Sequence, residues 1–218
     1  MKVNTDGVLL GAWIDPGNAG KILDIGTGTG VIALIMAQRT NAEITGIEIE
    51  KNAALEAAAN AENSIWSDRI KIFNISLQEF VRKNQTPFDL IVCNPPFFIN
   101  SKKSSDPGLS IAKHNELLSL EELAAFSAGL LQPDGRLAVI LPVKEANQFI
   151  TIAALKNLYL YRATEVKPKI FKNPVRMLME FSREEKEPEL SGLTIHNEDS
   201  SGFTDEYRAL TKEFYLNF

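Results

Sequence analysis

The chain has little cysteine or histidine: its 218 residues include only Cys93, His114 and His196. One cysteine excludes an internal disulfide and any metal site built from paired cysteines, and it agrees with a reducing compartment. The two histidines have no partners at the spacing of metal or general-base sites. We therefore expect no metal site, and we interpret Cys93 as a core residue.

A long apolar run is also missing. No stretch of about 18 apolar residues could span a bilayer, and the first residues lack the apolar segment of a signal peptide. The length and the 44% hydrophobic content fit one ordinary domain. We expect a cytoplasmic monomer in which residues 1–218 form a single domain, with its core at about 20–183 and an aromatic-rich tail, 190–218, docked on it.

Positive charge does not dominate the sequence, since the formal net charge is −5. A protein that coats nucleic acid without specificity depends on neutralising phosphates, so any nucleic-acid contact must be local. Two basic stretches, 98–115 and 166–179, would supply it, although both also fit ordinary solvated surfaces. Their candidate contact residues are Lys102, Lys103, Lys167, Lys169, Lys172 and Arg176.

Apolar runs alternate with amphipathic helical stretches, as in a mostly parallel sheet covered on both faces. Helices are predicted at 30–39, 52–63, 77–83, 120–131 and 144–156. Only a short connection separates the last two strands, so they must form an antiparallel pair. This α/β pattern predicts a Rossmann-like sheet of seven strands in the order 3-2-1-4-5-7-6, at residues 21–27, 43–49, 70–75, 89–94, 136–141, 159–166 and 175–182.

A glycine-rich turn, Asp24-Ile25-Gly26-Thr27-Gly28-Thr29-Gly30, connects the first strand to the first predicted helix. Glycines let the backbone bend tightly and let a ligand approach without meeting a β-carbon. Val31 stands where a dinucleotide fingerprint would have its last glycine, which disfavours a nicotinamide cofactor. An acidic residue ahead of the glycines suits the methionine ammonium group of S-adenosylmethionine, and we assign that contact to Asp24, with Gly26, Gly28 and Gly30 lining the cofactor.

Two later residues would complete the cofactor site. Glu48 ends the second strand, where an acidic side chain usually accepts hydrogen bonds from both ribose hydroxyls. Glu50 is the alternative, and either could instead cap the next helix. After the third strand, Asn74 or Ser76 would meet the adenine, and the amide oxygen of Asn74 could accept from its amino group.

The second motif, Asn94-Pro95-Pro96-Phe97, ends a buried strand. Prolines stop the strand and fix the direction of their carbonyls, at the sheet edge where open α/β sheets bind ligands. The Asn94 oxygen and the Pro95 carbonyl can each accept one N–H of an exocyclic amine, which aims its lone pair at a methyl donor. Phe97 would stack on the base, and Phe98 would shape the wall or take over that role.

With both motifs present, the sequence resembles the bacterial tRNA1(Val) adenine-N6 methyltransferases, a class I family with an Asn-Pro-Pro-Phe motif. The resemblance also rests on the segment from Lys2 to Trp13 and on the tail from Tyr207 to Tyr215. It implies methylation of the adenine just 3′ of the anticodon, and it places Thr5 and Asp6 beside the cofactor. Members usually carry basic and aromatic residues ahead of Thr5, so we expect either an altered RNA affinity or a different start of the chain.

Other functions are compatible with parts of this pattern. A guanine-N2 methyltransferase or a protein glutamine methyltransferase would present the same amine chemistry. Glutamine enzymes usually carry tyrosine after the two prolines and a preceding helical domain, whereas this chain has Phe97. A module that binds S-adenosylmethionine and RNA without catalysis is the non-enzyme alternative.

Overall fold

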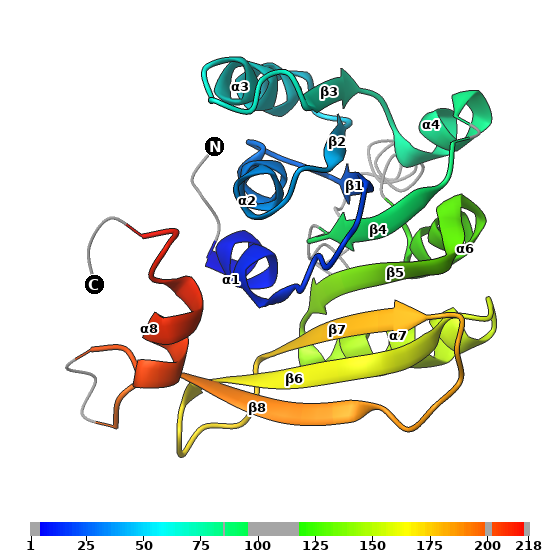
Figure 1. Ribbon diagram of the computed structural model, residues 1–218. Helices are drawn as coiled ribbons and strands as arrows, with labels where there is room; N and C mark the ends of the chain where they lie inside the picture. The colour runs from blue at the N-terminus through cyan, green and yellow to red at the C-terminus, as the bar shows by residue number, and fades with distance from the viewer. Residues whose placement is uncertain (1–4, 85, 96–117, 199–201, 216–218) are drawn as a thin grey trace, which may run out of the picture.

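The computed structural model describes residues 5–84, 86–95, 118–198 and 202–215 (Figure 1). Strands and helices alternate through most of the chain, and a short helix follows the last strand. The strands are β1 (Lys21–Ile25), β2 (Glu43–Glu48), β3 (Ile70–Asn74), β4 (Phe88–Cys93), β5 (Leu131–Leu141), β6 (Tyr159–Lys169), β7 (Arg176–Ser182) and β8 (Glu189–His196). The helices are α1 (Thr5–Trp13), α2 (Val31–Arg39), α3 (Lys51–Glu62), α4 (Leu77–Lys83), α6 (Leu120–Leu130), α7 (Val143–Ala154) and α8 (Asp205–Thr211).

The sheet order is β3-β2-β1-β4-β5-β7-β6-β8. Strands β1 to β5 are mutually parallel, and β7 is antiparallel to both β5 and β6. The predicted fold class, strand order and terminal hairpin are therefore confirmed. The predicted count of seven strands was wrong, because β8 pairs in parallel with β6 at the sheet edge. Half of β8 is exposed, so it lacks the apolar alternation that identifies a strand in a sequence.

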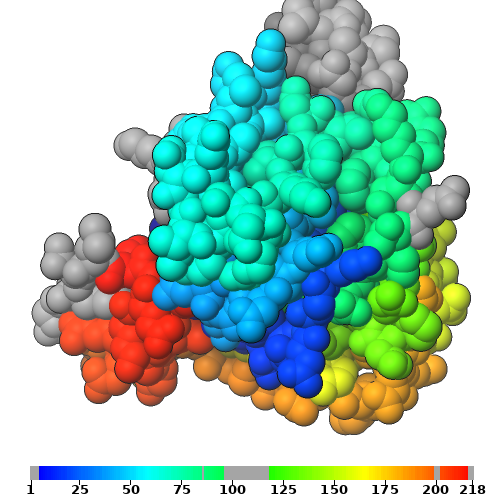
Figure 2. All heavy atoms as spheres, turned by 45° about the horizontal axis from the view of Figure 1, so that its top comes forward, coloured from blue at the N-terminus to red at the C-terminus, as the bar shows by residue number. Residues whose placement is uncertain are grey.

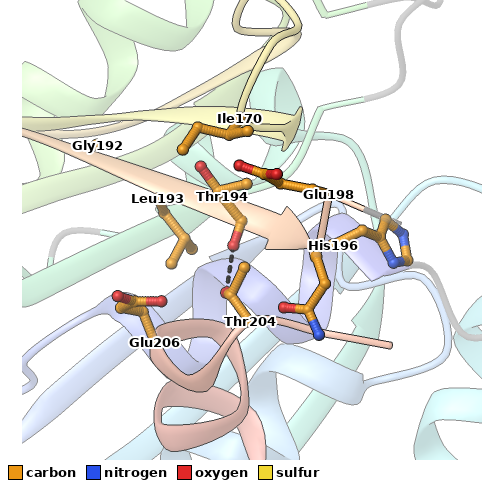
Figure 3. A pocket seen from close by; sticks show the side chains of 9 residues that line it. Ile170, Gly192, Leu193, Thr194, His196, Glu198, Thr204 and Glu206 are labelled. Carbon is orange, nitrogen blue, oxygen red and sulfur yellow. Dashed lines mark hydrogen bonds between the residues drawn. The ribbon is translucent and has the colours of Figure 1, made fainter. Parts of the chain in front are cut away.

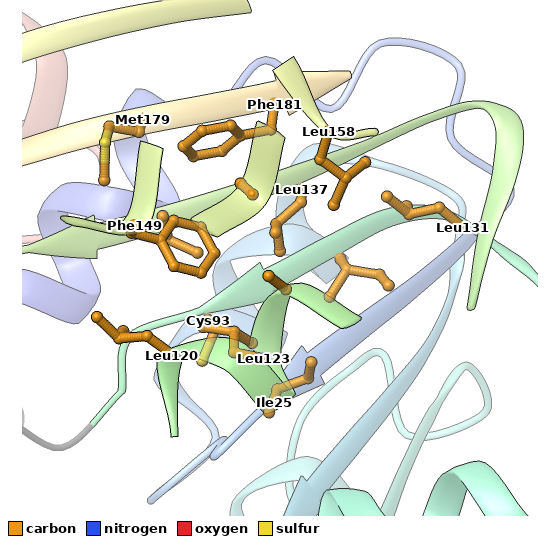
Figure 4. Close-up of a cluster of buried hydrophobic side chains, with 14 of the residues drawn as sticks. Ile25, Cys93, Leu120, Leu123, Leu131, Leu137, Phe149, Leu158, Met179 and Phe181 are labelled. Carbon is orange, nitrogen blue, oxygen red and sulfur yellow. The ribbon is translucent and has the colours of Figure 1, made fainter. Parts of the chain in front are cut away.

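Side chains alternate between the two faces of the sheet and form two cores. Leu23 and Ile91 point into a cluster covered by α4, α6 and α7, part of which is drawn in Figure 4. Ile22 and Val92 point into the opposite cluster, which includes residues of α1, α2 and α8. A parallel sheet buried on both faces explains why its strands read as nearly continuous apolar runs.

Helix α1 was missing from the sequence prediction. Its segment is apolar nearly all round and contains two glycines, so it shows little helical amphipathicity. The glycines permit close packing, since a β-carbon at Gly11 would lie 3.0 Å from Cδ1 of Ile35 in α2. Arg39 holds the end of α1 by donating hydrogen bonds to the carbonyls of Gly11, Ala12 and Ile14.

The C-terminal segment packs on the same core as α1. Tyr207 of α8 is 1% exposed and belongs to the cluster that contains Val8 and Leu9. In the space-filling view, this red segment lies at one end of the molecule, next to the orange strand β8 (Figure 2). Within the described ranges, no helix is long and apolar enough to cross a membrane.

Candidate active site

The candidate site lies where the strand order reverses. Strand β1 is flanked by β2 on one side and β4 on the other. From β2 the sheet continues outward to β3, and from β4 it continues outward in the opposite direction to β5. Open α/β sheets bind ligands in the crevice at the carboxyl ends of such strands. The candidate residues lie at these carboxyl ends: Asp24, Glu48 and Asn74 are among the last two residues of β1, β2 and β3, and Asn94 directly follows β4.

The glycine loop, residues 26–30, has the backbone that its sequence predicts. Gly26, Gly28 and Gly30 have φ values of 68°, 58° and 86°, a left-handed region that other residues rarely adopt. The amides of Gly26 and Thr27 donate to the Ile47 carbonyl, which ties the loop to β2. A β-carbon at Gly26 or Gly28 would meet no atom of the described residues within 4 Å, which leaves space over the loop for a ligand.

Asp24 offers a buried acceptor beneath this loop. Its side chain is fully buried, and Oδ2 accepts a 2.6 Å hydrogen bond from Thr27 Oγ1, while Oδ1 has no partner among the described residues. Burial raises the pKa of Asp24 from 3.8 to about 7, against the lowering effects of the Thr27 hydroxyl and the Ala33 backbone amide, and the Glu48 carboxylate adds to the rise. A ligand cation at Oδ1 would compensate this buried carboxylate.

Glu48 and Glu50 have separate roles in the structure. Glu50 caps α3 by accepting from the amides of Asn52 and Ala53, so the capping alternative applies to this residue. Glu48 accepts from the Gly28 amide at 2.9 Å through Oε2 and from the Glu50 amide at 2.9 Å through Oε1. A carboxylate has about four acceptor positions, so Glu48 retains capacity for ribose hydroxyls beside the loop.

Asn74 joins the ends of β2 and β3. Its Nδ2 donates to the carbonyls of Glu48 and Ile49, at 2.8 and 3.0 Å. Because both bonds use the amide nitrogen, the amide oxygen remains available to accept from an adenine amino group. Ser76, the alternative, caps α4 by accepting from the Glu79 amide.

Asn94 follows β4 on the other side of the glycine loop. Its Oδ1 is buried and has no hydrogen-bond partner among the described residues. A β-carbon built at Gly7 would lie 3.7 Å from Asn94 Nδ2, so α1 covers one side of this amide. Pro95 is buried beside it. The other residues expected here, Pro96, Phe97, Phe98, Lys102 and Lys103, lie outside the described residues.

Comparison with known proteins gives the family. A family model, the methyltransferase small domain, matches residues 4–165. The tRNA1(Val) (adenine(37)-N6)-methyltransferase of Trichodesmium erythraeum is 42% identical, over 100% of this chain and 92% of its own length. The enzyme of that name from Flavobacterium psychrophilum is 44% identical, over 99% and 93%. The chain belongs to this family of tRNA1(Val) (adenine(37)-N6)-methyltransferases.

A solved structure supports the fold of this methyltransferase. The predicted O-methyltransferase Atu636 from Agrobacterium tumefaciens superposes with a TM-score of 0.73, covering 95% of this chain and 96% of its own. At 19% identity, that likeness concerns the fold alone. The family's methyl donor, S-adenosylmethionine, fits the part of the chain that the structure describes, since Asp24 Oδ1 has no partner there and none of its atoms fills the space over Gly26 and Gly28.

Asp6, predicted beside the cofactor, and Arg176, predicted as an RNA contact, bind each other in this methyltransferase. Thr5, the first residue of α1, is exposed, whereas Asp6 is half-buried. Arg176, which the sequence suggested as an RNA contact, donates through Nε to Asp6 Oδ2 at 2.8 Å. The pair joins β7 to the first turn of α1, next to Gly7. Arg176 therefore has a partner within the protein that its sequence context did not reveal.

The lysines of the second basic stretch lie at the end of the sheet where Asn94 lies, which is the end formed by the carboxyl termini of the parallel strands. Strand β6 is antiparallel to β7, which is antiparallel to β5, so β6 runs in the direction of β4 and ends at the same side. Lys167 and Lys169 lie near the end of β6, and Lys172 lies in the turn that follows. The predicted strands were sufficient to derive this placement.

A recess of about 280 Å³ adjoins this hairpin, between the end of β8 and the start of α8 (Figure 3). Its lining includes Ile170 of the hairpin, His196 at the end of β8, Asn197 directly after it, and the acidic residues Glu198 and Glu206. No local pattern in the sequence indicates this recess, because β8 itself was not predicted. Cys93 is 1% exposed in the core, and burial raises the pKa of its thiol, so it stays protonated and inert. Among the described residues, no group of histidine, cysteine and acidic side chains is arranged to hold a metal.

Proposed function

We propose that this chain transfers the methyl group of S-adenosylmethionine to N6 of adenine 37 in tRNA1(Val). The observation that carries the proposal is the buried Oδ1 of Asn94, which has no hydrogen-bond partner among the described residues, together with the Oδ1 of Asp24 on the neighbouring strand β1, which also has none there. The Asn94 oxygen suits a substrate amine, and the Asp24 oxygen suits the ammonium group of the cofactor. The substrate follows from family membership, since relatives of 38% to 44% identity carry the name of this activity.

The cofactor would be held by residues of four neighbouring segments. Asp24 would bind the ammonium, the glycine loop would lie along the amino-acid and ribose portions, Glu48 would accept from the ribose hydroxyls, and Asn74 would accept from the adenine. When bound, S-adenosylmethionine supplies an electrophilic methyl on a sulfonium. The fixed hydrogen bonds of Glu48 and Asn74 hold both side chains in place before the ligand arrives, which lowers the cost of ordering them.

Asn94 and Pro95 would orient the adenine amine. The N6 lone pair is delocalised into the ring, so the amine is a poor nucleophile until its N–H bonds are held out of that conjugation. Asn94 Oδ1 and the Pro95 carbonyl would accept one N–H each, and the lone pair would face the methyl group. Once methylated, the nitrogen is acidic and loses a proton, so this proposal requires no strong base.

The RNA would cross the carboxyl edge of the sheet. Lys167, Lys169 and Lys172 would meet phosphates, and we propose Lys102 and Lys103 for the same role. A base in an anticodon loop is partly unstacked, so its extrusion costs less than opening a duplex. Phe97 and Phe98 would stack on the extruded adenine. We further propose that residues 1–218 act as one domain and as a monomer in the cytoplasm, with no metal in the reaction.

The test is transfer of labelled methyl from S-adenosylmethionine to tRNA from a strain that lacks this modification, followed by digestion to nucleosides. N6-methyladenosine in one tRNA species is the expected product. Label in N2-methylguanosine would support the guanine alternative instead, and label on protein glutamine would support the third. Cofactor binding without transfer to any RNA or protein would indicate a binding module.

A further inference from the structure

The tip of the β6–β7 hairpin, residues 167–174, carries an aromatic side chain that the fold does not use. Phe171 is 81% exposed, and its neighbour Ile170 is 53% exposed. The hairpin is closed by backbone bonds instead, from Val175 N to the Val166 carbonyl and from Lys172 N to the Lys169 carbonyl. A phenylalanine left in solvent at a turn contributes nothing to the core, which suggests an external partner.

Basic residues surround this aromatic. Lys167, Lys169 and Lys172 lie on the same tip, with no acidic residue between positions 166 and 175. Single-stranded nucleic acids are bound by this combination, in which cations follow the phosphates and aromatic rings stack on bases. A purely apolar tip would suit a protein partner, and a purely basic one would suit phosphates alone.

The tip also lies at a useful distance from the reacting base. Three strand spacings separate β4 from β6 through β5 and β7, which is roughly 14 Å at about 4.8 Å each. In the sheet register Asn94 lies level with Thr164, and Phe171 follows seven residues later, so the tip lies roughly 20 Å further along the strands at about 3.3 Å per residue. A stacked RNA strand covers the combined span of roughly 25 Å with about seven nucleotides at roughly 3.4 Å each, and an extended strand needs fewer. A loop whose target adenine lies at Asn94 therefore reaches the hairpin tip.

The recess beside the hairpin would orient the bound RNA strand. In the sheet register, Lys167 lies beside Thr194 and Lys169 beside His196, so the lysines border the recess that Ile170 also lines. Glu198 and Glu206 within it would repel phosphates but accept hydrogen bonds from base amino groups. The backbone would then follow the lysines, with bases turned toward Phe171 and the recess.

We propose that Phe171 stacks on a second base of the anticodon loop, several nucleotides from the methylated adenine, while the three lysines bind the intervening phosphates. This inference rests on the proposed function, and it assigns to the hairpin tip the selection of the RNA rather than the chemistry. Stacking is tolerant of base identity, so Phe171 provides affinity and register.

The experiment compares Phe171→Ala, Phe171→Leu and Phe171→Trp in steady-state methyl transfer to the tRNA. Phe171→Ala should raise the KM for tRNA about 5- to 150-fold, with kcat and cofactor Kd unchanged. Tryptophan should restore the KM, and leucine should not. Leu155→Ala is the matched control, because Leu155 is 78% exposed just before β6, at the opposite sheet edge.

Salt dependence separates stacking from charge. Lys172→Gln should reduce the slope of log KM against log salt by about 0.7, the value for one phosphate contact on a single strand, whereas Phe171→Ala should leave the slope unchanged. An unchanged KM for Phe171→Ala, in an enzyme that methylates tRNA, would overturn the inference and leave the proposed function intact. Full rescue by leucine would also overturn it, in favour of an apolar protein-like contact. A wild-type chain that methylates no tRNA would contradict the proposed function itself.

Discussion

Arg176 Nε lies 2.8 Å from Asp6 Oδ2, an ion pair that fixes the first turn of α1 to β7. The next residue, Gly7, packs beside the Asn94 amide. At the other end of α1, the Arg162 guanidinium lies 3.9 Å over the Trp13 ring and donates to the Trp13 carbonyl. Arginines thus hold both ends of the helix that packs beside the Asn94 amide, and we expect α1 to position this side chain.

Reversing the charges of this pair tests that relationship. Asp6→Lys should lower kcat about fivefold, the equivalent of ~1 kcal/mol, because the first turn of α1 loses its attachment beside Asn94. The side chains of Arg176 and Asp6 are 29% and 17% exposed, so solvent screens the ion pair and we expect no larger loss of kcat. Steady-state methyl transfer by Asp6→Lys, Arg176→Glu and the double variant is the measurement.

The double variant should recover most of the kcat, since the reversed pair can form again. If Arg176 instead contacts RNA phosphates, the double variant would keep a raised KM for tRNA and a reduced salt slope. That result would return Arg176 to the role its sequence context suggested.

The sequence predicted the parts of this site that depend on local chemistry. Asp24, the glycines and Asn94 could be placed together because each lies in the last residues of a buried strand or directly after it, and parallel strands bring their carboxyl ends together. Their roles in binding and catalysis stay predictions. Helix α1, strand β8 and the Asp6–Arg176 pair could not, because their stability comes from tertiary contacts. Residues 6 and 176 meet only after the sheet has formed, and nothing in either local pattern indicates the other.

Removal of the Asn94 amide should affect chemistry more than binding. Asn94→Ala should reduce kcat by about 10²- to 10³-fold, the usual effect of losing one group that is aligned with the transition state. The Kd for S-adenosylmethionine should change little, because the assigned cofactor contacts lie on β1, β2 and β3. Single-turnover transfer and calorimetric titration measure the two effects.

Asn63→Ala removes an identical amide at the end of α3, where Asn63 Nδ2 donates to the Ala59 carbonyl of the same helix, and serves as control. Its kcat should equal that of the wild type. Parallel losses of kcat and cofactor affinity in Asn94→Ala would contradict the assigned role.

The glycine loop should be sensitive to a single methyl group. Gly28→Ala places a β-carbon at φ 58°, which costs about 1–2 kcal/mol in stability, and fills the space over the loop. We expect a lower melting temperature and at least a tenfold weaker cofactor Kd. Gly129→Ala in α6 also meets no atom within 4 Å, but without a left-handed backbone. It should stabilise the protein by about 0.5–1 kcal/mol and leave the Kd unchanged.

Cofactor binding should depend on pH through Asp24. Without ligand its pKa is raised to about 7 by burial, so the carboxyl is largely protonated at pH 6 and ionised at pH 8. The ammonium of the cofactor binds the carboxylate, so affinity should weaken as pH falls below about 7, by up to tenfold per unit. An α-amino group loses its proton near pH 8, so affinity should weaken again above that value. Titration with S-adenosylhomocysteine from pH 5.5 to 9 should therefore give a maximum between 7 and 8.

The Asp24→Asn variant removes the acidic limb of that profile. It should bind more weakly at pH 7.5 and show no weakening between pH 7 and 5.5. Asp24 has the opposite effect on the stability of the ligand-free protein. Its pKa is about 7 in the folded state and 3.8 in the unfolded state, so the protonated carboxyl favours folding. The free energy of unfolding should therefore fall as pH rises from about 4 to 7. Saturating cofactor should reduce that decline, because it lowers the pKa again. A wild-type affinity that stays constant from pH 5.5 to 7 would show that the ammonium is bound elsewhere.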